Sequence, residues 1–412
     1  EYPGTTFNAS NTLVIADSVS NGGGAALAAA EQDTTGLIDG VVVGEPEVNP
    51  QMPAGGLNIQ RGATVYPALA VGRPLYDYMS LANLLQPCAA FATDAAGSPL
   101  GATIPIPQEN AERRCTALAT AGYVTGADFQ SRANDALARL RAAGWEAESN
   151  LLHYSHWWTQ ATPAVTVTYA NAYARARVTE NLCGYSFTPT LSLTGDPFVP
   201  ATSPMTTVFG VGNGVPPTAG ISLVYNLAIG GPVAHNFANN DLGYAGADCL
   251  RQLWSTQSAD ALRVQQGVNE VKLTGNLRGK PAIILHGRSD ALVPVNHTSR
   301  PYFGLNKLND PASKLSYIEV LNAQHFDAFL GIPGYNTLFV PLHYYTQQAL
   351  DLMWNHLRNN AALPPSQVVR PVPRGGAAPD LTTANLPAIS LAPPVANQIT
   401  FNAASRTVQI PD

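Results

Sequence analysis

The sequence predicts an α/β fold, in which a mainly parallel sheet is covered by helices and the chain is interrupted by a large insertion. Residues 12–19, 21–32 and 37–43 have the patterns of a strand, a helix and a second strand. Apolar strands return at residues 281–287 and 314–321, whereas the region between loses this regularity. Alternation of this kind is typical of parallel strands that are joined by helices.

The composition indicates a globular protein with a sizeable core. The chain has 412 residues, of which 45% are hydrophobic, and a chain of this length can bury a large apolar interior. Only 12% of the residues are charged, and the formal net charge is −6. Because such a surface offers no basic patch for phosphates or anionic lipids, we expect neither nucleic acid nor a membrane as a partner.

Four cysteines stand at wide spacings, at Cys88, Cys115, Cys183 and Cys249. No Cys-x-x-Cys pair occurs, which argues against a structural zinc site. Two disulfides and four buried thiols are both compatible with this count. In an oxidising compartment, the pairs closest in sequence would be 88 with 115 and 183 with 249, which is one of three pairings.

The pattern divides the chain into three regions. Residues 1–50 and 271–360 are expected to form the α/β domain, and residues 51–270 an insertion within it. Residues 361–412 are rich in proline, and we expect this tail to wrap the surface in extended form or to add an edge strand.

The first strand-to-helix turn has the features of a nucleophile elbow. It reads Ser-Val-Ser-Asn-Gly at residues 18–22, so Ser20 takes the nucleophile position of the G-x-S-x-G pattern and Ser18 replaces the first glycine. A sharp turn of small residues raises a serine toward a base and toward backbone N–H groups that hold an oxyanion. A phosphate-binding turn and an ordinary turn are the alternatives, but G-x-G-x-x-G and Gly-Lys-Ser/Thr are both absent.

An acid and a histidine follow in the chain order of α/β-hydrolases, which is Ser, Asp or Glu, then His. Asp290 follows the strand that ends at residue 287, and His325 follows the strand that ends near residue 321. Since the carboxyl ends of parallel strands meet at one edge of a sheet, we expect Ser20, Asp290 and His325 to meet there. The sequence therefore predicts an α/β-hydrolase sheet with a Ser-His-Asp triad.

Other residues offer alternative assignments. Asp290 could instead cap a turn, and Asp327 is a rival acid close to His325. His286 lies inside a buried strand and is expected to be a structural histidine. The backbone N–H of Asn21 follows the nucleophile and is the expected oxyanion donor.

Few residues precede the nucleophile strand. An α/β-hydrolase has several strands before its elbow, but here only residues 1–11 come before it. We therefore expect the chain to lack the N-terminal strands of the sheet and one oxyanion donor. On this interpretation the chain is the C-terminal portion of a longer polypeptide, whose N-terminal fragment would be a partner.

Four segments together resemble the D-(−)-3-hydroxybutyrate oligomer hydrolases, bacterial enzymes that cleave the oligoesters left by poly(3-hydroxybutyrate) depolymerases. They are residues 18–26, 38–46, 285–294 and 322–327. The family's nucleophile is the serine of Ser-Val-Ser-Asn-Gly, which falls on Ser20. The roles of Asp290 and His325 are instead inferred mainly from their order along the chain. The resemblance implies an extracellular or periplasmic serine esterase that releases 3-hydroxybutyrate monomer through an acyl-enzyme, without metal or cofactor.

Under this resemblance, residues 51–270 become a lid and substrate domain. Tyr154, Trp157 and Trp158 would line an apolar slot for the oligoester, although aromatic residues in an inserted domain more often form its own core. Arg175 would hold the terminal carboxylate of the substrate. Two rival functions remain, an esterase or peptidase with another acyl substrate and a hydrolase-fold binding protein without turnover.

Overall fold

The computed structural model of the protein describes residues 4, 6–8, 11–102, 106–189, 221–376 and 380–412. The chain forms two compact units. The sheet unit comprises residues 1–75, 142–149 and 272–412, and the helical unit comprises residues 76–141 and 150–271. Residues 51–75 and the tail thus belong with the sheet unit, a different division from the expected one; residues 190–220 of the expected insertion lie outside the described residues.

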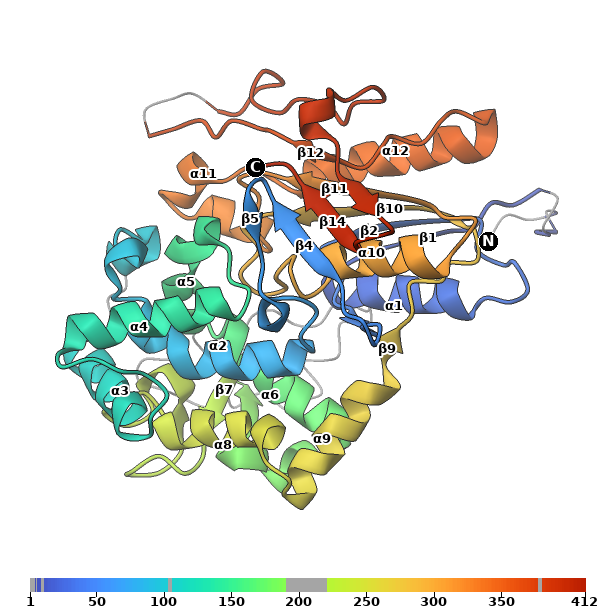
Figure 1. Cartoon of the computed structure of the whole chain (residues 1–412). Helices are drawn as coiled ribbons and strands as arrows, with labels where there is room; N and C mark the ends of the chain where they lie inside the picture. The colour runs from blue at the N-terminus through green and yellow to red at the C-terminus, as the bar shows by residue number, and fades with distance from the viewer. Residues whose placement is uncertain (1–3, 5, 9–10, 103–105, 190–220, 377–379) are drawn as a thin grey trace. The chain divides into compact units, whose positions relative to one another are not determined.

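A five-stranded parallel sheet is the centre of the sheet unit (Figure 1), in the order β1-β2-β10-β11-β12. Its strands are Ile15–Val19, Gly40–Gly44, Pro281–Gly287, Lys314–Val320 and Gln367–Val369. All four neighbouring pairs run parallel. The α/β prediction is confirmed, and the carboxyl ends of these strands lie along one edge.

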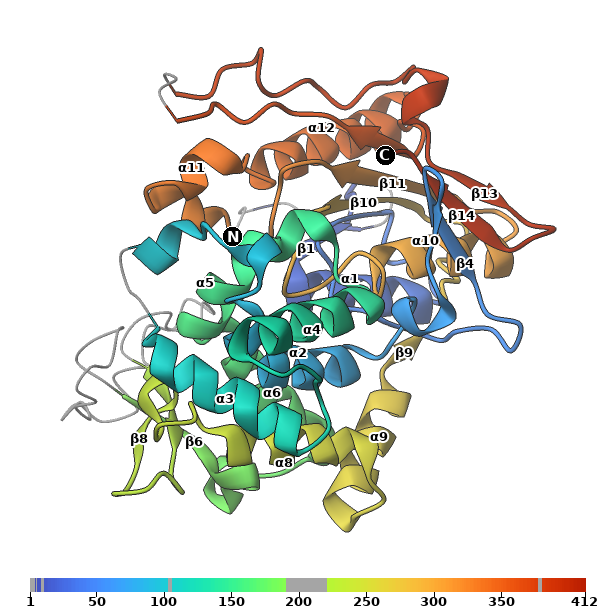
Figure 2. The same cartoon turned by 60° about the vertical axis from the view of Figure 1, so that its left-hand side comes forward.

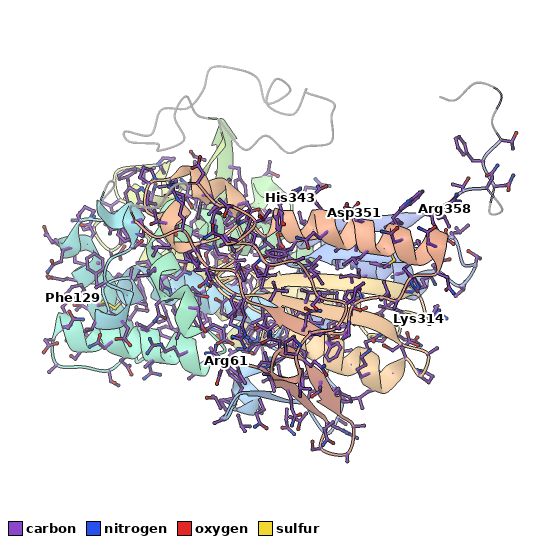
Figure 3. The ribbon with its side chains drawn as sticks, turned by 90° about the horizontal axis from the view of Figure 1, so that it is seen from above. Arg61, Phe129, Lys314, His343, Asp351 and Arg358 are labelled. Atoms are coloured by element: carbon purple, nitrogen blue, oxygen red, sulfur yellow. A yellow bond between two sulfur atoms is a disulfide. The ribbon has the colours of Figure 1, made fainter. Side chains whose placement is uncertain are left out.

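Helices cover both faces of this sheet. Helices α1 (Ser20–Gln32) and α10 (Ser299–Asn309) lie on one face, and α12 (His343–Asn359) lies on the other (Figure 1). Along β2, Val41 and Val43 join the first core while Val42 joins the second. A strand that is buried on both faces needs apolar side chains at successive positions, which explains the uninterrupted apolar run. In Figure 3, His343 marks the start of α12 and Arg358 its last turn.

The proline-rich tail adds strands to the sheet unit. It supplies β12 at the edge of the central sheet and the hairpin of β13 (Thr400–Asn402) and β14 (Thr407–Ile410). Strand β14 pairs parallel with β4 (Asn58–Arg61), beside which it lies in Figure 2. Strand β4 in turn pairs with β5 (Thr64–Val65), which is labelled in Figure 1. The expectation of an added edge strand is confirmed.

Smaller elements complete the sheet unit. Strands β3 (Asn49–Pro50) and β9 (Lys272–Leu273) form a parallel pair, and α11 spans Tyr335–Leu338. Short 3₁₀ turns occur in both units, at Ala68–Ala70, Thr93–Ala95, Pro99–Ala102, Ala147–Leu152, Val178–Glu180, Leu182–Gly184, His235–Phe237, Asp327–Gly331 and Val395–Asn397.

The helical unit contains the longer helices α2, α3, α4, α6, α8 and α9 and the short helix α5. Their bounds are Leu75–Ala89, Gln108–Thr120, Phe129–Ala142, Ala161–Ala174, Tyr244–Ser255, Ala259–Glu270 and, for α5, His153–Trp158. Three antiparallel strands, β6 (Tyr185–Pro189), β7 (Ile221–Tyr225) and β8 (Val233–Ala234), form its sheet.

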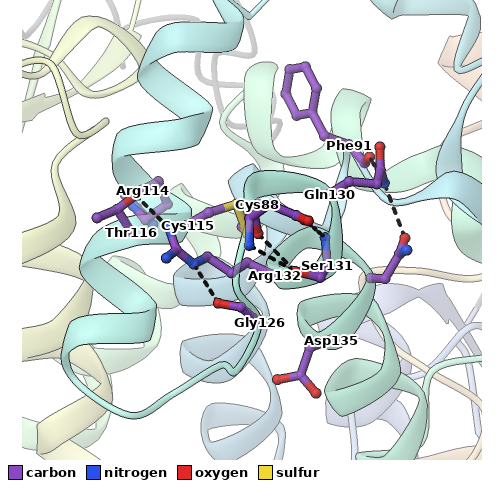
Figure 4. The surroundings of a disulfide bond; sticks show 12 residues. Cys88, Phe91, Arg114, Cys115, Thr116, Gly126, Gln130, Ser131, Arg132 and Asp135 are labelled. Carbon is purple, nitrogen blue, oxygen red and sulfur yellow. Dashed lines mark hydrogen bonds between the residues drawn. A yellow bond between two sulfur atoms is a disulfide. The ribbon is translucent and has the colours of Figure 1, made fainter.

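Two disulfides cross-link the helical unit. Cys88 of α2 is bonded to Cys115 of α3, beside the hydrogen bond from Arg132 to the carbonyl of Gly126 (Figure 4). Cys183 is bonded to Cys249 of α8. The structure thus contains the pairing of cysteines closest in sequence. Among the described helices, none has the length and apolar character needed to cross a bilayer.

A buried cluster of charges supports the carboxyl side of β11. The Glu319 carboxylate accepts hydrogen bonds from Arg288 and Arg300, and from the Tyr317 hydroxyl at 2.8 Å. Burial alone would raise the pKa of Glu319, but the two guanidiniums hold this pKa well below its usual range. Arg300 also donates to Glu146 at 2.6 Å. The charges are therefore mutually compensated inside the core.

We predict that Glu319→Ala lowers the free energy of unfolding of the sheet unit by about 3–5 kcal/mol, because two guanidiniums would remain buried without their shared carboxylate. Urea denaturation measures the change. The matched control is Glu109→Ala, which removes an exposed i,i+4 pair with Arg113 and should cost under about 1 kcal/mol. Equal effects of the two substitutions would contradict this view of the cluster.

Candidate active site

Ser20 stands on a strained strand-to-helix turn at the carboxyl end of β1. Strand β1 ends at Val19 and helix α1 begins at Ser20, with no loop between them. The φ angle of Ser20 is 53°, which is uncommon for a residue other than glycine. Such a conformation persists only where surrounding contacts fix it, and strained nucleophile turns are typical of the G-x-S-x-G elbow.

The glycine run allows α1 to lie unusually close to its neighbours. A Cβ atom at Gly22 would lie 2.0 Å from Ser18 Oγ, so the serine that replaces the first glycine already fills the space there. A Cβ atom at Gly24 would lie 2.1 Å from the backbone oxygen of Glu47. These positions therefore need glycine because the first turns of α1 press against β1 and against the segment that follows β2.

The three predicted triad residues lie within hydrogen-bonding distance of one another. Ser20 Oγ is 3.0 Å from His325 Nε2. His325 Nδ1 is 2.8 Å from Asp290 Oδ2. Asp290 and His325 are buried. The three side chains come from the carboxyl ends of β1, β10 and β11, as the strand pattern predicted.

Asp290 is held as an anion by several donors. Its Oδ1 atom accepts hydrogen bonds from the backbone N–H groups of Leu292 and Val293, both at 2.8 Å. Burial alone would raise the pKa of Asp290, but the His325 imidazole and the hydrogen bonds from His325 and His286 hold it well below its usual range. An ionised Asp290 is suited to orient the His325 ring and stabilise its protonated form.

His286 is a hydrogen-bonded residue of the buried strand β10, and it also contacts the acid. Its Nε2 atom lies 2.8 Å from the Val293 carbonyl oxygen and 3.2 Å from Asp290 Oδ2. Because a carbonyl only accepts, Nε2 carries the hydrogen, and Nδ1 accepts from the Ser299 hydroxyl at 2.7 Å. His286 therefore supports Asp290, a role that the sequence did not reveal.

Asp327, the rival acid, is engaged elsewhere. Its carboxylate accepts hydrogen bonds from the backbone N–H groups of Leu342 at 2.9 Å and His343 at 2.8 Å. These groups belong to the start of α12, where N–H groups have no acceptor within the helix. Asp327 thus anchors α12, while Asp290 contacts His325.

Two glutamates that sequence reasoning missed follow β2. Glu47 Oε1 lies 3.1 Å from Ser20 Oγ, and its Oε2 accepts from the Asn21 side-chain amide at 3.2 Å. The Glu47 backbone N–H donates to the Ser20 carbonyl oxygen at 2.9 Å. The sequence offers one hint of Glu47, since this residue lies just beyond β2, the strand that comes after β1 along the chain.

Glu45 is the second of these glutamates and is almost fully buried, with 7% of its surface exposed. Its φ angle is 30°, and its Oε2 atom has no hydrogen-bond partner among the described residues. Burial raises the pKa of Glu45 to about 8; the nearby Asp290 and Asp327 carboxylates add to this increase, and His325 opposes it. Glu45 is therefore a largely neutral carboxyl beside the histidine at pH 7.

The charge of His325 is set by these acids. Burial alone would lower the pKa of His325, but Asp290, Glu45 and Glu47 together raise it to about 9. The imidazolium is thus strongly stabilised. Such an environment favours proton uptake from Ser20, the step in which a general base becomes charged.

The backbone N–H of Asn21 lies in the first turn of α1, where N–H groups have no acceptor within the helix and the helix dipole favours negative charge. This placement fits the predicted oxyanion donor, which remains a prediction. Among the described residues, no group of three or more His, Cys, Asp or Glu side chains is arranged to hold a metal ion.

The expected substrate residues all belong to the helical unit. Tyr154, Trp157 and Trp158 are buried there, and the two tryptophans pack against rings of the same unit, Trp157 on His235 with centroids 5.1 Å apart and Trp158 on Phe237 at 5.3 Å. Arg175 is exposed and forms an ion pair with Glu270. Packing within the unit accounts for the tryptophans, and a substrate role for all four residues remains a prediction.

Comparison with known proteins gives one consistent result. The family model of the 3HB-oligomer hydrolases matches residues 3–412. Proteins named D-(-)-3-hydroxybutyrate oligomer hydrolase from Burkholderia thailandensis, Burkholderia pseudomallei and Burkholderia mallei are each 56% identical over 406 residues, or 97% of this chain. The chain spans 57% of the length of these relatives. No solved structure matches the chain.

We predict that Gly24→Ala disrupts the elbow, because the new methyl group would collide with the Glu47 carbonyl oxygen. Overpacking of this kind costs about 1–3 kcal/mol, and esterase activity should fall at least roughly tenfold if Ser20 moves away from His325. The control is Gly331→Ala, since a Cβ atom there meets nothing within 4 Å. Wild-type activity in Gly24→Ala would show that the close approach is dispensable.

We predict a pH profile in which kcat/KM rises toward pH 9, because only neutral His325 can accept the Ser20 proton. Above its pKa of about 8, Glu45 is ionised, and its charge favours the protonated form of His325, whose pKa is about 9. Glu45→Gln should therefore lower the pKa of His325 and move the acidic limb to lower pH. The measurement is kcat/KM against pH for both proteins. An unchanged limb, or one moved to higher pH, would contradict the assigned coupling.

Proposed function

Because the chain belongs to the 3-hydroxybutyrate oligomer hydrolase family, we propose that it is a serine esterase that hydrolyses 3-hydroxybutyrate oligomers to the monomer. The observation that carries the proposal is the continuous hydrogen-bonded path from Ser20 through His325 to Asp290. The relatives' name supplies the substrate class, since a triad fixes the type of reaction and leaves the acyl group open.

In the proposed acylation, Ser20 Oγ attacks the ester carbonyl carbon while His325 Nε2 takes the hydroxyl proton. The carbonyl oxygen becomes an oxyanion, which the backbone N–H of Asn21 stabilises at the start of α1. The intermediate then collapses, and the bond between carbonyl carbon and alcohol oxygen breaks. His325 gives its proton to the departing alcohol, which leaves Ser20 esterified by a 3-hydroxybutyryl group.

Deacylation repeats these steps with water as the nucleophile. His325 takes a proton from water as the oxygen attacks the acyl carbon, and it returns that proton to Ser20 Oγ as the acyl bond breaks. The products are a free 3-hydroxybutyrate and the original enzyme. Asp290 stays ionised throughout and stabilises the imidazolium in both halves of the reaction.

The proposal extends to the architecture and the compartment. We assign the five-stranded parallel sheet to the α/β-hydrolase fold, because its first, third and fourth strands carry Ser, Asp and His in the order of that fold. The helical unit enters the chain between β2 and β10, and we assign it the lid and substrate role. The two disulfides support an extracellular or periplasmic location.

The test is release of 3-hydroxybutyrate from its trimer by the wild type, by Ser20→Ala, and by a control, Ser405→Ala, in an exposed turn. We expect Ser20→Ala to lower kcat by roughly 10³-fold or more and the control to match the wild type. Equal turnover by all three proteins would exclude Ser20 as the nucleophile.

Two further measurements separate the rival functions. A panel of short-chain esters and peptides tests whether another acyl substrate is preferred over the trimer. Labelling by an organophosphonate probe at Ser20 tests for a reactive nucleophile, which a non-catalytic binding protein would lack.

A further inference from the structure

A groove of about 340 Å³ lies in the sheet unit, between α10 and the tail. Small-ligand sites typically enclose about 300–1,000 Å³, so the groove can accept a small molecule. Lys307 of α10 and Ser366 of the tail line it, and none of its described lining residues is acidic. Lys307 donates to the carbonyl oxygen of Leu315 near the start of β11, and Ser366 comes just before β12. The groove therefore lies toward the amino ends of these strands, whereas the triad follows the carboxyl ends.

Lys307 keeps a hydrogen-bond donor for a ligand. Its Nζ atom donates to the Ser313 hydroxyl at 2.8 Å and to the Leu315 carbonyl oxygen at 3.1 Å. An ammonium group carries three hydrogens, so one of them has no acceptor among the described residues. The ammonium also lies over the Phe303 ring, 5.1 Å from its centroid. Both of its acceptors are neutral, and the positive charge is therefore suited to receive an anion.

The charge of Lys307 is only partly compensated. Burial lowers the pKa of this lysine, and the negative charge of Asp310 opposes the decrease. The Asp310 carboxylate is itself engaged, since it accepts hydrogen bonds from the backbone N–H groups of Gly279 at 3.0 Å and Ala312 at 3.2 Å. A carboxylate of a ligand on the remaining N–H of Lys307 would complete the compensation through a charge-assisted hydrogen bond.

The Ser366 hydroxyl is a second donor in the groove. Its oxygen accepts a hydrogen bond from the backbone N–H of Tyr317 at 3.0 Å, and its own hydrogen has no acceptor among the described residues. The backbone N–H of Ile399 donates to the Ser366 carbonyl oxygen at 2.9 Å. The two segments of the tail that line the groove are thus joined to each other, so the groove is formed before any ligand binds.

The remaining walls of the groove are largely apolar. Phe303, Ile399 and Phe401 line it together with the two donors. Phe303 and Ile399 belong to an apolar core, and Phe401 packs against that core. A ligand with a carboxylate at one end and a short hydrocarbon chain at the other matches both parts of the groove, whereas an inorganic anion would leave the apolar walls in contact with water.

We propose that this groove is a second binding site, which takes the anion of a short-chain carboxylic acid. The carboxylate accepts hydrogen bonds from Lys307 and Ser366, and the hydrocarbon chain lies against Phe303, Ile399 and Phe401. The monomer that the proposed esterase would release belongs to this class of ligand. The inference does not require that function, because the groove and the triad lie toward opposite ends of the strands.

Lysine NMR tests the proposal directly, because the chain has four lysines, Lys272, Lys280, Lys307 and Lys314. In wild-type protein labelled with carbon-13 at lysine Cε, butyrate should shift the Lys307 signal with a Kd in roughly the millimolar range. Acetate should bind about tenfold more weakly, because it lacks two CH2 groups that the apolar walls would bury. Loss of the signal in Lys307→Arg assigns it.

Variants identify the residues that hold the ligand. By calorimetry, Lys307→Met should weaken butyrate binding at least roughly tenfold and Ser366→Ala to a smaller extent. The matched control is Lys314→Met, which removes an exposed lysine, labelled in Figure 3, and should leave the affinity unchanged. The titration of the wild type needs no substitution, so it decides the question even if a variant fails to fold.

Salt controls separate a built site from general attraction of anions. Sodium chloride at the same ionic strength as the butyrate should leave the Lys307 signal in place. The proposal is overturned if butyrate does not shift this signal, if chloride shifts it equally, or if acetate and butyrate bind with the same affinity.

The Ser20→Ala protein separates this inference from the proposed function. It should show the same shift of the Lys307 signal with butyrate as the wild type, because Ser20 lies at the other end of the sheet. If the wild type has no esterase activity but the shift is present, the proposed function fails and the binding site stands. If the esterase activity is present without the shift, the binding site alone is overturned.

Discussion

The close approach between the first turns of α1 and the segment after β2 is the contact on which the site depends. The absence of a side chain at Gly24 lets the Glu47 carbonyl oxygen come within 2.1 Å of where a Cβ atom would stand. The same contact holds the Ser20 carbonyl oxygen on the Glu47 backbone N–H and keeps Ser20 at a φ angle of 53°. Strain at Ser20 is thus balanced by packing and hydrogen bonds that only small residues permit.

Four carboxyl groups near His325 occupy different environments. Asp290 receives two backbone N–H groups and two histidines and stays ionised. Asp327 is bound to the start of α12, and Glu47 contacts the elbow. Glu45 has little compensation for its burial, and its pKa rises to about 8. His325 therefore lies beside an ionised carboxyl group, Asp290, and a largely neutral one, Glu45, because the environments of the two carboxyl groups differ.

The sequence predicted Ser20, Asp290 and His325 because each follows an apolar strand, and carboxyl ends of parallel strands converge. It did not reveal Glu47, since the contact of this side chain with Ser20 depends on how the segment after β2 packs against the first turns of α1. The extent of the sheet unit was unpredictable for a similar reason. Strand β4 is held there by β14, a partner more than 300 residues later in the chain.

The central claim is that Ser20 carries the acyl group during turnover. The most direct measurement is rapid acid quenching of the protein with 3-hydroxybutyrate trimer, followed by proteolysis and mass spectrometry of the peptide that contains Ser20. We expect a 3-hydroxybutyryl adduct on Ser20 that disappears as the substrate is exhausted. An adduct on another residue of an active protein would contradict the assignment of the nucleophile.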